Sequence, residues 1–167
     1  MNSSELENLL NQSSTLRPKR SSNQMPRRAL KNRESGLWRI IKDGLKMTGR
    51  KIETTRLESW SLPGVPDVLL CSESGVFSFL ELKVTKGRAD KLSLSPHQCS
   101  WLSRHSGGPC FIIVRDSSLD IRVYRGSGAV DLRMDGLAAV SPLAVFTEPY
   151  DWAEFFRLTS PLQRGMG

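Results

Sequence analysis

The segment between residues 68 and 82 constrains the fold more than any other part of the chain. Two apolar runs, VLL and FSFL, are separated by a short polar stretch that ends in Gly75. Glycine readily adopts the left-handed conformation that closes three-residue hairpin loops, so the pattern predicts a β-hairpin in which Val68 pairs with Leu80. Both faces of the two strands carry apolar side chains, which is typical of a central strand pair covered on two sides.

Three charged residues lie at the base of this hairpin. In the predicted register Asp67 lies opposite Glu81, and Lys83 faces the same side as Glu81 because alternate strand residues point the same way. Two adjacent carboxylates with little water around them stay ionised only with a cation between them, and Mg²⁺ or Mn²⁺ meets this need. Lys83 would then orient or deprotonate a water molecule or balance phosphate charge. The alternative is an exposed Lys–Glu pair, which the apolar flanks disfavour.

The elements around the hairpin are predicted from periodicity and turn residues. Apolar residues recur at helical spacing over about 34–46, and alternating β-branched residues predict a strand near 52–59. Ser95 and Pro96 open a second helix that ends near His105. The runs CFIIVRD and IRVYRG predict two further strands.

The chain divides into three predicted parts. Residues 1–33 form a basic N-terminal arm that we expect to be disordered, with seven basic and no acidic residues in its second half. The arm either binds phosphates or is an ordinary solvated tail. A core spans 34–126, and 127–167 is an extension, irregular up to a short helix that follows Asp151.

Composition narrows the function classes. A net charge of +7 and a pI near 9.7 favour a polyanionic partner such as nucleic acid. No apolar run approaches the ~20 residues of a spanning helix, and the N-terminus lacks a secretory pattern, so we expect no membrane contact and a cytoplasmic protein. Three cysteines without a CxxC pair argue against a disulfide framework and structural zinc. The motifs of P-loop enzymes and serine hydrolases are missing.

GVPD, followed after the hairpin by ELK, resembles the PD-(D/E)XK nuclease superfamily. The pattern is most similar to VRR-NUC members and to phage-encoded restriction-like or Holliday junction resolvase-like nucleases. The resemblance implies an α/β fold of restriction-endonuclease type, a mixed central sheet flanked by helices in the order α-β-β-β-α-β over about 34–116. It also implies that Asp67, Glu81 and the backbone carbonyl of Leu82 hold the metal, with Lys83 as a catalytic residue.

Three further residues are candidates for this site. Such nucleases often carry an acidic residue on their first helix, which Glu34 matches, although a carboxylate there also suits the helix dipole. Glu58 competes with Glu34 as third carboxylate, and the sequence does not choose between them. The family frequently has a glutamine on the helix after Glu-X-Lys, which Gln98 matches, but Ser95 and Gln98 also form a capping box.

The expected function is metal-dependent endonucleolytic hydrolysis of DNA phosphodiester bonds. The substrate is double-stranded or branched DNA, and the residues do not separate junction resolution, restriction-type cleavage and flap or nick processing. The protein is a possible homodimer. An alternative is an inactive nuclease fold that binds nucleic acid or belongs to a virion. Basic residues expected to contact DNA are Lys86, Arg88, Lys91, Arg27 and Arg28.

Overall fold

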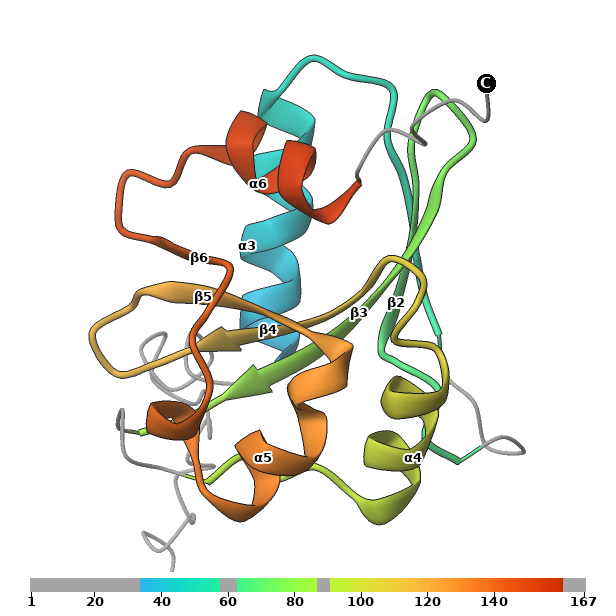
Figure 1. Ribbon diagram of the computed structural model, residues 1–167. Helices are drawn as coiled ribbons and strands as arrows, with labels where there is room; N and C mark the ends of the chain where they lie inside the picture. Colours follow the sequence, from blue (N-terminus) through green and yellow to red (C-terminus); the bar gives the residue numbers. More distant parts are fainter. Residues whose placement is uncertain (1–33, 58–62, 87–90, 161–167) are drawn as a thin grey trace, which may run out of the picture.

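A computed structural model describes residues 34–57, 63–86 and 91–160 (Figure 1). Within these residues, six strands form one sheet in sequence order, and only β3 and β4 run parallel. The strands are β1 (Glu53–Arg56), β2 (Val68–Cys71), β3 (Phe77–Val84), β4 (Cys110–Arg115), β5 (Ile121–Arg125) and β6 (Ala144–Phe146). A parallel pair needs a crossover connection, and helix α4 lies in that crossover.

Helices cover both faces of the sheet (Figure 1). On one face α3 and α6 contribute to an apolar cluster that includes Leu37, Leu80 and Phe155, and on the other α4 and α5 contribute to a second cluster that includes Leu102 and Ile112. The helices are α3 (Glu34–Met47), α4 (Pro96–Arg104), α5 (Ala129–Met134) and α6 (Trp152–Thr159), with short 3-10 turns η1 (Gly126–Gly128) and η2 (Leu137–Ala139). The predicted mixed sheet flanked by helices is therefore confirmed, and α3-β1-β2-β3-α4-β4 follows the expected order.

The predicted hairpin register is confirmed. Val68 pairs with Leu80, and at the loop the Ser72 amide donates to the Val76 carbonyl at 3.0 Å. Gly75 has a φ of +74°. Strand β3 is buried on both faces, since Leu80 and Leu82 enter one apolar cluster and the partly buried Phe79 packs against the other. Any charge at the end of β3 is thus held by a rigid central strand.

The ends of the chain differ in part from expectation. Strand β1 is shorter than the predicted 52–59, and residues 58–62 lie outside the described part. The segment 127–150 is not irregular, because it holds α5, η2 and β6. Elements this short, interrupted by glycines, show no periodicity, and β6 forms because β5 offers it a strand edge. The helix after Asp151 is confirmed, with the Asp151 side chain accepting from the Glu154 amide.

The proposed arm, residues 1–33, lies outside the described residues, as does 161–167. Among the residues that are described, none of the helices has the length and apolar character required to cross a bilayer.

Candidate active site

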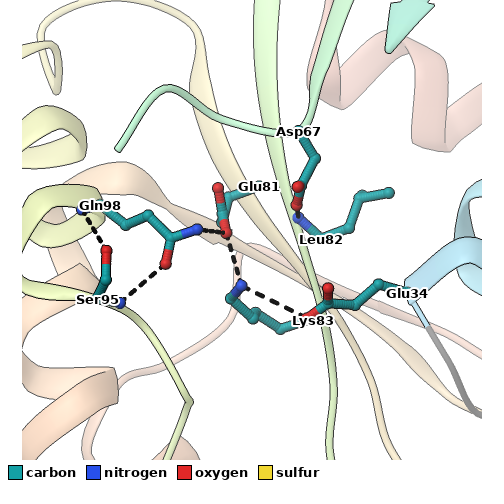
Figure 2. Close-up of polar contacts among 7 residues, drawn as sticks. All are labelled: Glu34, Asp67, Glu81, Leu82, Lys83, Ser95 and Gln98. Atoms are coloured by element: carbon teal, nitrogen blue, oxygen red, sulfur yellow. Dashed lines mark hydrogen bonds and ion pairs between the residues drawn. The ribbon is translucent and has the colours of Figure 1, made fainter. Parts of the chain in front are cut away.

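Asp67 lies at the entry to β2, one residue before the strand begins. The register of β2 and β3, extended by one position, places it opposite Glu81. Its Oδ2 accepts a hydrogen bond of 2.8 Å from the backbone amide of Leu82 (Figure 2). The Asp67 carboxylate is thereby held against the backbone of β3, beside the Glu81 side chain.

Pro66 explains why this space is open to a side chain. In an antiparallel ladder alternate residue pairs exchange backbone hydrogen bonds. The bond between Ser72 and Val76 sets that alternation, which makes Pro66 and Leu82 a pair that should bond. Proline has no N–H to give to the Leu82 carbonyl, and the Leu82 amide donates to Asp67 instead. Since N–H and C=O of one strand residue point to the same side, the Leu82 carbonyl faces the edge that Asp67 occupies.

Glu81 is fully buried, and its two carboxylate oxygens differ. Oε1 accepts from Lys83 Nζ at 2.8 Å and from Gln98 Nε2 at 2.5 Å. Oε2 is buried and has no hydrogen-bond partner within the described part of the chain. Burial, followed by the negative charge of Asp67, raises the pKa of Glu81 to about 7 despite the opposing effect of Lys83. A buried oxygen without a hydrogen-bond partner costs free energy, so a ligand that binds Oε2 would stabilise this carboxylate.

Lys83 places a positive charge between two acidic residues. Only 7% of it is exposed, and its Nζ lies 2.8 Å from Glu81 Oε1 and 3.5 Å from Glu34 Oε1 (Figure 2). Burial lowers the pKa of Lys83, but the charge and hydrogen bond of Glu81, with smaller contributions from Glu34 and Asp67, leave the pKa above its ordinary value. Lys83 is therefore an ammonium at neutral pH, suited to balancing charge rather than to removing a proton.

Gln98 caps helix α4 and also contacts Glu81. It completes the capping box, since its backbone amide donates to Ser95 Oγ at 3.1 Å and its side-chain Oε1 accepts from the Ser95 backbone amide at 2.9 Å. Its Nε2 still donates to Glu81 (Figure 2). The N-terminus of α4 and the Glu81 carboxylate are thus joined by one side chain.

The structure brings Glu34 to this cluster from the first residue of α3. It contacts Lys83, and its side chain is 44% exposed. Glu58 lies outside the described residues, so the choice between Glu58 and Glu34 as third carboxylate stays open. Within 34–57, 63–86 and 91–160, no three His, Cys, Asp or Glu side chains are arranged to hold a metal ion. A metal here would rest on two carboxylates and backbone oxygen.

A pocket of about 330 Å³ adjoins the cluster on the Lys83 side. Lys86 and Lys91, both predicted to contact DNA, are part of its wall, whereas Arg27, Arg28 and Arg88 lie outside the described residues. The lining residues are Glu34, Lys83, Val84, Thr85, Lys86, Lys91, Leu92 and Ser93. Positive charge therefore continues outward from the buried lysine.

Pro66 was not identified from the sequence as the reason that the Leu82 amide is left to bond the Asp67 side chain. The signal was available, because the predicted register already set a proline opposite Leu82, where the ladder needs an N–H donor.

No family model and no curated protein matches the chain. Among solved structures it is similar to the Holliday junction resolvase Hjc of the archaeal hyperthermophile Archaeoglobus fulgidus, with 17% sequence identity and a TM-score of 0.35. The match covers 53% of this chain and 76% of that one. A likeness of this extent carries no argument about chemistry.

Proposed function

We propose that this protein is a metal-dependent DNA endonuclease. The observation that carries the proposal is the buried Oε2 of Glu81, which has no hydrogen-bond partner among the described residues. The Asp67 carboxylate lies beside it and adds a second negative charge. A hard divalent cation satisfies such an oxygen and removes the repulsion between the two carboxylates. The donors present are all oxygens, which suits Mg²⁺ or Mn²⁺ and disfavours softer metals.

Three groups would hold the ion: the carboxylates of Asp67 and Glu81 and the Leu82 carbonyl, which faces the same strand edge. When bound, a divalent ion supplies a more acidic water molecule and polarises a phosphate oxygen. The Lys83 ammonium lies beside this position and balances the negative charge that develops on the phosphate under attack. Gln98 keeps the Glu81 carboxylate in place through its side-chain amide, which donates to Oε1.

Charge outside the cluster supports DNA as the substrate. The net charge of +7 attracts a polyanion, and Lys86 and Lys91 extend positive charge from Lys83 into the adjoining pocket. We propose that they bind phosphates next to the cleaved bond, aided by Arg88 and by Arg27 and Arg28 of the arm. Double-stranded or branched DNA is the proposed partner, and dimerisation of the protein belongs to the same proposal.

A nicking assay tests the activity. Supercoiled plasmid is incubated with the full chain in Mg²⁺, in Mn²⁺ or with a chelator, and we expect nicks only with metal. DNA binding is measured in parallel on the same samples. Binding without cleavage in either metal would contradict the proposal and favour an inactive nuclease fold that binds nucleic acid.

A substrate panel then assigns the finer activity. Linear duplex, nicked duplex, flap and four-way junction carrying the same end label are compared at equal concentration. Preferential cleavage of the junction, with symmetric cuts, would identify a resolvase, and equal cleavage of plain duplex would identify a restriction-type enzyme.

A further inference from the structure

The chain enters the candidate site through a close contact between a loop and a helix. Gly64 lies three residues before Asp67 and has a φ of +93°, where residues with a Cβ are strained. Space excludes a side chain as well. A Cβ at Gly64 would lie 2.5 Å from the carbonyl carbon of His97 and 3.0 Å from the amide nitrogen of Gln98. The backbone at Gly64 is therefore packed directly on the first turn of α4.

The same turn of α4 holds the other carboxylate. Gln98 donates to Glu81 Oε1, and its own position is set by two hydrogen bonds with Ser95. Asp67 in turn is tied to β3 through the Leu82 amide. These contacts form a closed ring. The chain leads from Asp67 back to Gly64, which packs on α4, and Gln98 of α4 bonds Glu81 on β3. The bond from the Leu82 amide to Asp67 closes the ring, and Figure 2 shows its polar members.

We infer that Gly64 is a positioning residue that sets the separation of the Asp67 and Glu81 carboxylates through the first turn of α4. The inference rests on the proposed function, because that separation matters only if the two carboxylates share a ligand. A side chain at position 64 must push the loop away from backbone atoms of α4, which cannot rotate aside as a flexible side chain does. Asp67 follows three residues later and moves relative to Glu81.

The chain contains a matched control for this substitution. Gly75, in the loop at the far end of the same hairpin, has a φ of +74°, and apart from its own residue and its two chain neighbours no atom lies within 4 Å of the place that its Cβ would take. Gly75→Ala therefore carries similar backbone strain without the contact. Any effect seen in Gly64→Ala and not in Gly75→Ala comes from the contact with α4.

The test measures Mn²⁺ binding to the metal-free full chain by calorimetry, alongside its thermal unfolding. For Gly64→Ala we expect the Mn²⁺ dissociation constant to rise at least about tenfold, the range seen when groups supporting metal ligands are lost. Gly75→Ala should bind Mn²⁺ like the unaltered protein. Equal affinities in Gly64→Ala and Gly75→Ala would overturn the positioning role, whereas no Mn²⁺ binding by the unaltered protein would instead overturn the proposed function.

Ser95→Ala decides the question if Gly64→Ala does not fold. The Ser95 side chain is exposed, and its hydroxyl contacts the α4 backbone. Its removal loosens the first turn of α4 while the helix stays anchored by buried Cys99 and Leu102. We expect weaker Mn²⁺ binding with retained folding, and an unchanged dissociation constant would overturn the inference.

Discussion

Two buried clusters of charge lie on this sheet, and they are built differently. The Glu81 cluster consists of Asp67, Glu81, Lys83 and Gln98. The Asp116 cluster, at the turn between β4 and β5, consists of Asp116, Ser118, Asp120 and Arg122. Both place a carboxylate with almost no exposure beside a mostly buried cation.

The Asp116 carboxylate has partners on both oxygens. Oδ1 accepts from the Ser118 amide at 2.9 Å and from its hydroxyl, and Oδ2 accepts from Arg122 Nε at 3.1 Å. Burial by itself raises the pKa of Asp116, but the hydrogen bonds from Ser118 and the charge of Arg122 bring the pKa below its usual range. The protein alone stabilises this charge.

In the Glu81 cluster both donors converge on Oε1, while Oε2 has none among the described residues. Another carboxylate, Asp67, lies close by and raises the pKa of Glu81 further after burial. The difference between the clusters is therefore the placement of donors and not the number of charges. Under the proposed function, the oxygen that Glu81 leaves unpaired is the one that a metal ion would take.

The largest expected difference between the clusters is in cleavage. Glu81→Gln and Asp67→Asn should lower the plasmid nicking rate by about 10²–10³-fold or more, as loss of a charge-stabilising group does in other enzymes. Asp116→Asn, assayed below its unfolding temperature, should cleave at the unaltered rate per folded molecule. DNA binding by Glu81→Gln should be equal or tighter, because a negative charge is removed. Normal nicking by Glu81→Gln would end the assignment of function to this cluster.

The effects on stability should be opposite to those on cleavage, because the substitution at Asp116 should lower the free energy of unfolding more than the one at Glu81. Asp116→Asn removes the negative charge nearest to Arg122, which is mostly buried. Asp120, 3.5 Å from Arg122, still pairs with it, so the substitution should cost about 2 kcal/mol. Glu81→Gln removes a charge that burial and Asp67 disfavour, but it also removes the nearest ion-pair partner of Lys83. Because the pKa of Glu81 is raised to about 7 even with Lys83 beside it, the first effect outweighs the second, and the substitution should be neutral or stabilising in metal-free protein at neutral pH. Urea unfolding with a chelator measures both. The exposed Glu73, paired with Arg50, provides the control, since Glu73→Gln should change the free energy of unfolding by less than about 1 kcal/mol. A larger loss for Glu81→Gln than for Asp116→Asn would contradict the comparison.

The two carboxylates should also respond to pH in opposite senses. The folded-state pKa of Glu81, about 7, exceeds its ordinary value of 4.5, so its contribution to stability is complete below pH 4.5 and declines as the pH rises through 7. The lowered pKa of Asp116 gives a contribution that is present above pH 3.8 and is lost on acidification. Unfolding of metal-free protein from about pH 4 to 8 measures the first, and Glu81→Gln should remove the decline. An unchanged pH profile in Glu81→Gln would show that another group titrates.

The smallest effect is expected at the edge of the Glu81 cluster. Lys91→Ala should lower the slope of the logarithm of DNA affinity against the logarithm of salt concentration by about one, with little change in cleavage at saturating DNA. Lys46→Ala is the matched control, because Lys46 lies in the last turn of α3, at the opposite end from Glu34. Equal slopes for the two variants would remove Lys91 from the DNA-binding surface.

The predicted arm and the division into core and extension remain predictions. Residues 1–33 fall outside the described part, while α6, placed in the predicted extension, packs on the same apolar cluster as α3 through Phe155 and Phe156. Sequence patterns identified α6 from its Asp151 cap, but they could not show which surface the helix covers, because partners distant in the chain decide that.

Local sequence was enough to specify the register of the hairpin and the shared face of Glu81 and Lys83. Both follow from the two-residue period of a strand and from the turn at Gly75, which are properties of neighbouring residues. The Ser95–Gln98 capping box could be predicted for the same reason, since its partners are three residues apart.

The distribution of donors around Glu81, in contrast, depends on how the helices pack on the sheet. The α4 crossover brings Gln98 to Glu81 across 17 positions, and α3 brings Glu34 to Lys83 across 49. The contact of Gly64 with α4 arises in the same way, from packing of separate elements. Hydrogen-bond partners distant in sequence carry no periodic signal, so the unpaired oxygen of Glu81 became visible only when helices and sheet were assembled.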